Sequence, residues 1–193
     1  MCQSGGIDLQ SGGKWDKIWR LLGSGEGMWD AGLARRPPIK EREEHMFLGQ
    51  YTHAIDEKGR LTIPARFREA LAHGAYISQG FERNLMVLTA NAFESVSVRV
   101  NRMSITDPTA RQLKRLIFAT ADSVELDKAG RIRIPQFLRD LAALDTDTIV
   151  VGVGDYFEIW SPDAWSPQAA LLHDADANTQ RFVALDLSSQ AAD

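Results

Sequence analysis

Short runs in which hydrophobic and polar residues alternate begin near residue 46, and turns rich in Gly, Pro, Asn or Asp separate them. The clearest run is Phe47–Ile55. In an extended strand its Tyr51, His53 and Ile55 fall on one face, and the residues between them fall on the other. Further strands are expected at Arg60–Ile63, Ala75–Gln79, Asn84–Leu88, Ala121–Leu126, Arg131–Ile134, Thr148–Val153 and Tyr156–Trp160.

Helical spacing appears between these strands. A helix is predicted at Ala65–Ala72 after Pro64, and another at Pro135–Leu144, because proline suits the first turn of a helix. Asp107-Pro108 predicts the start of a further helix, whereas the stretch after Ala90 fits a helix or a strand. The predicted core includes five apolar residues of these segments: Phe67, Leu71, Phe137, Leu138 and Leu141.

One stretch of the chain occurs twice. Residues 56–68 read DEKGRLTIPARFR and residues 127–139 read DKAGRIRIPQFLR, so the two copies begin 71 residues apart. The strands and the helix after each copy also correspond, and the repeat covers about forty residues each time. We therefore expect one structural unit built twice.

Each copy begins with a turn. Asp56 can accept a hydrogen bond from the backbone two residues on, and Gly59 accepts the positive φ that closes a short hairpin. Asp127 and Gly130 occupy the same places in the second copy. These four residues are predicted to orient the turns.

The composition is that of a soluble globular protein, with 44% hydrophobic and 25% charged residues. No run approaches the length of a membrane span and no signal peptide is apparent, so a cytoplasmic protein is expected. The single Cys2 excludes a disulfide within the chain, and the four histidines show no metal-ligand spacing. Neither a metal nor a cofactor is predicted. The net charge of −4 means that any nucleic-acid binding must come from a local basic surface.

The paired motifs, together with the segment FLGQYTHAIDEKGRLTIPARFR, resemble the MraZ family of bacterial transcriptional regulators over about Met46–Trp165. The resemblance implies an α+β fold of two tandem AbrB/SpoVT-type domains. Each repeat would supply half of a swapped-hairpin β-barrel, with a pseudo-twofold axis within the chain. It also implies a ring-shaped homo-oligomer that binds double-stranded promoter DNA upstream of a cell-division and cell-wall gene cluster, and therefore a nucleoid-associated protein.

Basic residues of the two turns are the predicted DNA contacts, because lysine can meet phosphates and arginine can meet phosphates or guanine edges. These residues are Lys58, Arg60, Lys128, Arg131 and Arg133. The second turn moves its lysine by one place relative to the first. The first copy is therefore predicted to make the more direct DNA contact, and the second to be partly structural.

The resemblance divides the chain into a leader (1–45), a first domain (46–93), a helical connector (94–120), a second domain (121–165) and a flexible acidic tail (166–193). The leader is interpreted either as a disordered arm or as upstream DNA translated from a start chosen too early. Trp15-Asp16 and Trp29-Asp30 both require TGGGA in the DNA, the kind of G-rich repeat that such regulators recognise.

Two other functions fit parts of the sequence. A structural oligomer without DNA binding would hold Arg60 and Arg131 in salt bridges between the repeats. A hydrolase could use Asp56 and Asp127 as a catalytic pair. The sequence shows neither a nucleophile motif nor a phosphate-binding glycine loop, so an enzyme is not predicted.

Overall fold

The computed structural model describes residues 46–182, and both copies of the repeat lie within this range. The first copy contains β1 (Gln50–Ala54), β2 (Arg60–Thr62), the 3-10 helix η1 (Ala65–Phe67), β3 (Ala75–Gln79), β4 (Asn84–Thr89) and α3 (Ala90–Arg102). Helix α4 (Pro108–Ala119) then leads to the second copy. That copy contains β5 (Asp122–Val124), β6 (Arg131–Arg133), α5 (Gln136–Leu141), β7 (Asp147–Gly152), β8 (Tyr156–Trp160), α6 (Pro162–His173) and α7 (Ala175–Phe182).

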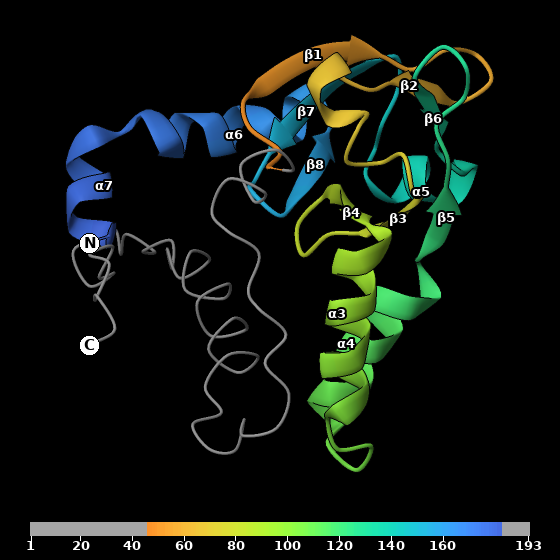
Figure 1. Cartoon of the computed structure of the whole chain (residues 1–193). Coiled ribbons are helices and arrows are strands. Elements are labelled where there is room, and N and C mark those ends of the chain that lie inside the picture. Colours follow the sequence, from red (N-terminus) through yellow and green to blue (C-terminus); the bar gives the residue numbers. More distant parts are fainter. Residues whose placement is uncertain (1–45, 183–193) are drawn as a thin grey trace, which may run out of the picture. The chain divides into compact units, whose positions relative to one another are not determined.

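The two copies exchange strands. The larger antiparallel sheet has the order β1-β7-β8-β4-β3-β5, so the first strand of each copy pairs with the third strand of the other. A second sheet consists of β2 and β6 alone (Figure 1). If each strand is replaced by the corresponding strand of the other repeat, the same order is obtained, read from the opposite edge of the sheet. The α+β class and the pseudo-twofold relation of the repeats therefore agree with the prediction.

The core lies between the two sheets. Leu61 and Ile132 are paired across β2 and β6, and both are buried beneath that small sheet. Phe67 contacts Phe47 and Phe157 at ring-centroid distances of 5.0 and 5.4 Å, so aromatic residues of both copies share one cluster. Burial of such rings supplies much of the hydrophobic stabilisation of a core of this size.

Helices α3 and α4 lie side by side and extend away from the sheet (Figure 1). Thr89 caps α3 by accepting from the Ala92 amide, and Asp107 caps α4 by accepting from the Thr109 amide. The stretch after Ala90 is therefore a helix. Within residues 46–182, no helix combines the length and the apolar character needed to cross a membrane.

The prediction that Phe137 and Leu141 belong to the core is wrong. Phe137 is 46% exposed and Leu141 is 42% exposed, whereas Leu138 and Ala142 of the same segment are buried. Helix α5 has only six residues, so it turns a single narrow face to the core. The predicted helix at Ala65–Ala72 is also shorter, because only η1 is regular and turns follow it.

Residues 162–182, which include most of the described part of the predicted tail, are largely helical. Helix α6 continues through His173, and α7 follows it as far as Phe182. Ser161 caps α6 by accepting from the Ala164 amide, and Trp165 anchors it against Trp160 of β8. The predictions for residues 1–45 and 183–193 lie outside the described residues.

Candidate nucleic-acid interface

The first turn is organised by the carboxylate of Asp56. Its Oδ1 accepts from the backbone amides of Lys58 and Arg60, each at 3.0 Å. Its Oδ2 accepts from Arg60 Nε at 2.7 Å and lies 2.7 Å from Arg60 Nη2. One carboxylate therefore binds both the backbone of the turn and the guanidinium that follows it.

The second turn repeats this arrangement. Asp127 Oδ1 accepts from the amides of Ala129 and Arg131 at 2.9 and 3.0 Å, and its Oδ2 accepts from Arg131 Nε at 2.9 Å. Arg131 differs from Arg60 in one respect, because its Nη1 also lies 3.5 Å from Asp56 Oδ2. An ion pair therefore joins the two turns.

Both aspartates remain ionised over a wide pH range. The side-chain hydrogen bond from Arg60 lowers the pKa of Asp56 to about 2, and the backbone bonds of the turn act in the same direction. The side-chain hydrogen bond from Arg131 likewise lowers the pKa of Asp127. The carboxylates can therefore hold the turns without change across neutral pH.

The turns are also joined through the backbone. The Ile63 amide donates to Gly130 O at 2.9 Å, and the Ile134 amide donates to Gly59 O at 2.8 Å. Each glycine has a positive φ, +74° for Gly59 and +73° for Gly130, as the hairpin prediction required. Each turn is thus held by the strand end of the opposite repeat.

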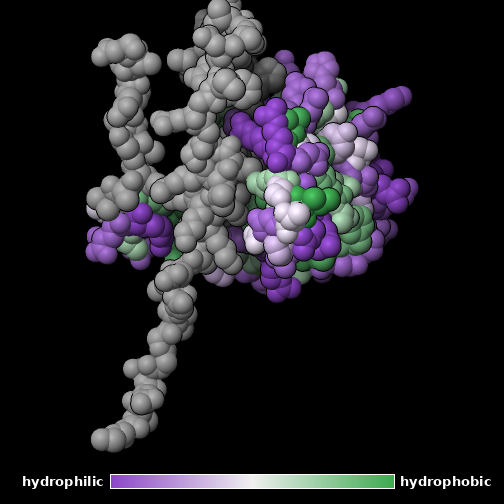
Figure 2. Space-filling model, turned by 90° about the horizontal axis from the view of Figure 1, so that it is seen from below, coloured by the Kyte–Doolittle hydropathy of each residue, from purple (hydrophilic) through white to green (hydrophobic). Residues whose placement is uncertain are grey.

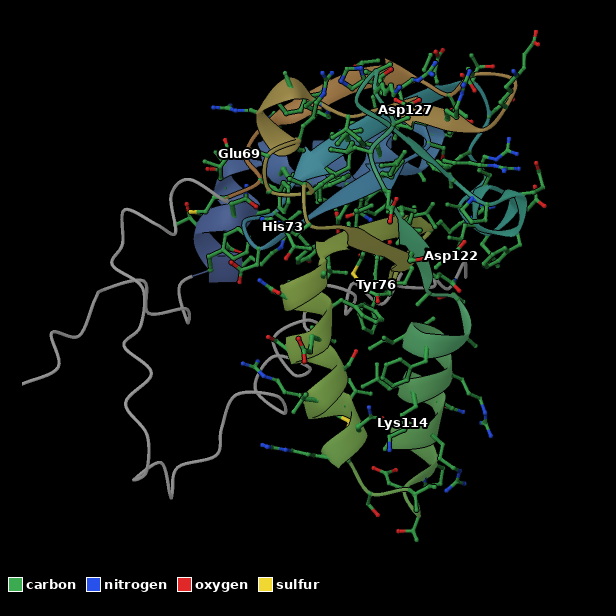
Figure 3. All side chains as sticks on the ribbon, turned by 45° about the vertical axis from the view of Figure 1, so that its right-hand side comes forward. Glu69, His73, Tyr76, Lys114, Asp122 and Asp127 are labelled. Atoms are coloured by element: carbon green, nitrogen blue, oxygen red, sulfur yellow. The ribbon has the colours of Figure 1, made fainter. Side chains whose placement is uncertain are left out.

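The outer surface of the small sheet is basic. Arg60 lies opposite Arg133, and Thr62 lies opposite Arg131, while the residues between them point into the core. Lys58, Lys128 and Arg133 are exposed and make no side-chain hydrogen bond or ion pair with any residue of 46–182. Figure 3 shows Asp127, at the start of the second turn, among polar side chains. We call the five cations Lys58, Arg60, Lys128, Arg131 and Arg133 the turn face.

Sequence reasoning did not identify two further residues at this site. Arg68 and Arg139 end the two copies of the motif, and each guanidinium packs against the glycine of the other repeat's turn. Their identical place in both copies was the available signal. Only the fold shows that the contact crosses between the repeats.

Alanine at Gly59 or Gly130 is expected to lower the free energy of unfolding. The positive φ alone costs roughly 1–2 kcal/mol for a side chain. A Cβ at Gly130 would also lie 2.4 Å from Arg68 Nε, so the loss should be larger there. Urea unfolding measures both losses. Gly74→Ala is the matched control, since Gly74 has φ +88° and nothing within 4 Å; an equal loss at Gly74 and Gly130 would contradict the contact.

Residues 46–182 contain no candidate metal site, because no three His, Cys, Asp or Glu side chains among them are placed to hold an ion. Asp56 and Asp127 are each occupied by arginine and amide donors. This arrangement suits a turn brace and not a pair of carboxylates that share a proton.

Comparison of the sequence with known proteins identifies its family. The family model "MraZ protein, putative antitoxin-like" matches twice, over residues 46–116 and 117–186. A protein of Thermomicrobium roseum named transcriptional regulator MraZ is 49% identical over 127 residues, which cover 66% of this chain and 89% of the relative. Proteins of the same name from Roseiflexus castenholzii and Salinispora arenicola are 44% and 41% identical, each over 72% of this chain and over 94% and 97% of the relative. The chain belongs to the MraZ family.

Proposed function

We propose that this protein is a sequence-specific DNA-binding transcriptional regulator and not an enzyme. The observation that carries the proposal is the turn face, where two braced arginines lie beside three cations that have no partner in 46–182, on a two-stranded sheet and its adjoining turns. The names of the relatives, transcriptional regulator MraZ, support the same function. The target we propose is a set of G-rich repeats upstream of its own operon in the cell-division and cell-wall cluster, which would associate the protein with the nucleoid.

The contacts divide by chemistry. Lys58, Lys128 and Arg133 can each neutralise a phosphate, because no partner in 46–182 competes for their charge. Arg60 presents a fixed guanidinium whose Nη1 makes no bond with any described residue, so that nitrogen can donate to guanine O6 or N7. Arg131 Nη1 lies near Asp56 instead. This difference supports the first repeat as the better base reader.

Binding measurements on purified protein test the proposal. A duplex from directly upstream of the gene is compared with a scrambled duplex of the same composition, over a salt series. We expect Arg60→Ala to remove the preference for the upstream duplex, and Arg131→Ala to weaken it less. A wild-type protein that binds neither duplex would favour a structural scaffold, and one that binds both equally would contradict sequence-specific recognition.

We also propose a ring-shaped homo-oligomer, because two helical arms of the chain carry complementary surfaces. The basic arm, residues 90–119, has five Lys and Arg against two Asp and Glu, and it exposes Val98 and Ile105. The acidic arm, residues 162–182, has three Asp against Arg181 alone, and it exposes Leu171, Leu172 and Phe182. A basic arm of one copy meeting an acidic arm of the next is a head-to-tail contact, which closes into a ring when the rotation allows.

The tip of the basic arm is suited to such a contact. Lys114 points between α3 and α4 (Figure 3) and donates to Met103 O at 3.2 Å, and Arg111 Nη1 donates to Ile105 O and Thr106 O at 2.9 Å. These bonds fix the connection on which Ile105 is 72% exposed. Figure 2, which views the molecule from the lower end of this arm in Figure 1, shows hydrophobic surface bordered by hydrophilic residues.

Single charges should open the assembly. Ile105→Glu and Leu172→Glu each place a carboxylate in an apolar contact, so sedimentation velocity is expected to show smaller species than for the wild type. Val153→Glu, at an exposed apolar position of the β7–β8 turn, is the matched control and should leave the assembly intact. Unchanged sedimentation of both arm variants would contradict the head-to-tail contact.

Assembly would also answer the small number of cations on one chain. Several turn faces meeting successive DNA repeats gain affinity through effective concentration, by roughly 100-fold or more where the geometry allows.

We infer in addition that the two sheets act as the swapped-hairpin barrel of the AbrB type. The bridge between Ile55 and Leu61, which links the end of β1 to the small sheet, supports this arrangement.

A further inference from the structure

The two arginines that end the repeated motif contact the turns crosswise. Arg68 belongs to the first repeat, and its Nε donates to Ile63 O at 2.9 Å. The same guanidinium covers Gly130 of the second turn, where a Cβ would lie 2.5 Å from Arg68 Cζ. Gly130 is buried although it belongs to an exposed turn. The arginine of one repeat therefore lies directly on the backbone of the other repeat's turn.

The second repeat returns the contact. Arg139 packs over Gly59, where a Cβ would lie 3.1 Å from Arg139 Cζ. Its Nη2 donates to Gln136 Oε1 in α5, which fixes the guanidinium from behind. Gly59 is buried as well. A Cβ at Gly130 would occupy the place of the Arg68 guanidinium, whereas one at Gly59 would press against that of Arg139.

These contacts join the two turns into one unit. Gly130 O accepts from the Ile63 amide, and Arg68 binds the carbonyl of the same Ile63. A displacement of the second turn would therefore disturb both the strand end and the arginine of the first repeat. The ion pair between Arg131 and Asp56 adds a third link on the outer side.

We propose that Arg68 and Arg139 are positioning residues for DNA recognition: each holds the opposite repeat's turn, so that the two turns keep a fixed spacing on the duplex. The inference rests on the proposed function for its purpose, but the crosswise coupling itself does not. Neither arginine needs to touch DNA. Preorganised contact groups bind more tightly than mobile ones, because less conformational freedom is lost on binding.

Hydrogen exchange measured by mass spectrometry tests the coupling without DNA. In Arg68→Gln, amides of residues 127–131 are expected to exchange at least about fivefold faster, with a smaller change at 56–60. Arg139→Gln should show the reverse. Arg83→Gln, at an exposed arginine of the β3–β4 turn, is the matched control and should change neither segment. Faster exchange of each variant's own turn would overturn the crosswise assignment.

DNA binding then separates positioning from direct contact. We expect Arg68→Gln to weaken binding to the upstream duplex about tenfold. The slope of log affinity against log salt should not change, because no phosphate contact is removed. Arg68→Lys keeps the charge but lacks the planar group and the Nε–H, so it should not restore binding. A slope reduced by about one would mean a phosphate contact, and full rescue by lysine would mean a role for charge alone; either result overturns the proposal.

The two proposals can fail separately. Wild-type protein that does not bind the upstream duplex would refute the regulator, while the exchange pattern would still decide the crosswise contact. Urea unfolding of each variant shows how much of any loss is global. Should Arg68→Gln fail to fold, the exchange pattern of Arg68→Lys decides the same question.

Discussion

The triple variant with alanine at Lys58, Lys128 and Arg133 is expected to bind upstream DNA more weakly at physiological salt. The affinity should fall by roughly 100-fold for each copy of the chain that contacts the duplex. These cations have no partner among residues 46–182, so a phosphate is the only anion that we assign to them. Each lost phosphate contact should also lower the slope of log affinity against log salt by about one. Fluorescence anisotropy over a salt series measures both quantities.

A charge-keeping variant is the control for this experiment. Lys58→Arg with Lys128→Arg and Arg133→Lys leaves three cations in place, so the salt slope should stay that of the wild type. The free energy of unfolding should change little in either triple variant, because all three side chains are exposed and unpaired within the described chain. Equal slopes for the alanine triple and the wild type would show that DNA does not meet the turn face.

Replacing Glu158 by glutamine is expected to stabilise the protein above neutral pH. Glu158 lies on β8 opposite Met86 of β4, where the two repeats meet, and it accepts from Trp160 Nε1 at 2.9 Å. Burial is the largest cause that raises the pKa of its carboxyl, to about 7; the charge of Glu82 acts in the same direction, and the hydrogen bonds with Trp160 and Asn84 oppose both. The folded protein thus prefers the neutral acid.

The direction of the pH dependence follows from this shift. A carboxyl whose folded-state pKa lies above its unfolded value of 4.5 contributes fully below pH 4.5, and the contribution is lost as the pH rises to about 7. The shift corresponds to about 3 kcal/mol. The lowered pKa of Asp56 acts in the opposite direction but at lower pH, between its ordinary value of 3.8 and about 2. The two windows therefore do not overlap.

Urea unfolding at pH 4.5 to 8 measures the effect. The free energy of unfolding of the wild type should fall across this range, while that of Glu158→Gln should fall less and exceed the wild type at pH 8; the remaining fall is assigned to Glu82, whose pKa is also raised by burial. Glu94→Gln, at an exposed position of α3, is the matched control. Parallel curves for Glu158→Gln and the wild type would mean that this carboxyl does not carry the dependence.

Local pattern was sufficient for most of the strands and for the turns. Alternation placed Tyr51, His53 and Ile55 on one face, and all three are less exposed than Thr52 and Ala54 between them. The bond from Asp56 to the amide two residues on follows from turn chemistry alone. Helical periodicity does not show which face of α5 is buried, since Phe137 and Leu141 have the same spacing as Leu138 and Ala142. Packing of the second repeat decided in favour of the latter pair.

Contacts between the repeats could not be predicted from either copy by itself. The partners of Gly59 and Gly130 are arginines of the opposite repeat, more than sixty residues away in the chain. Finding them requires knowing that β1 pairs with β7 and β5 with β3. The burial of Glu158 likewise depends on the joining of β4 to β8. In the sequence it is an ordinary polar residue of an alternating strand.

The most direct test of DNA recognition through the turn face is a hydrogen-exchange footprint of the protein with and without its upstream duplex. We predict slower exchange in residues 56–62 and 127–133, which carry the turn face, and unchanged exchange at the tip of the basic arm around Ile105. A scrambled duplex of the same composition should protect these segments less at equal salt. Protection confined to the basic arm, or absent from both turns at saturating DNA, would contradict recognition through the turn face.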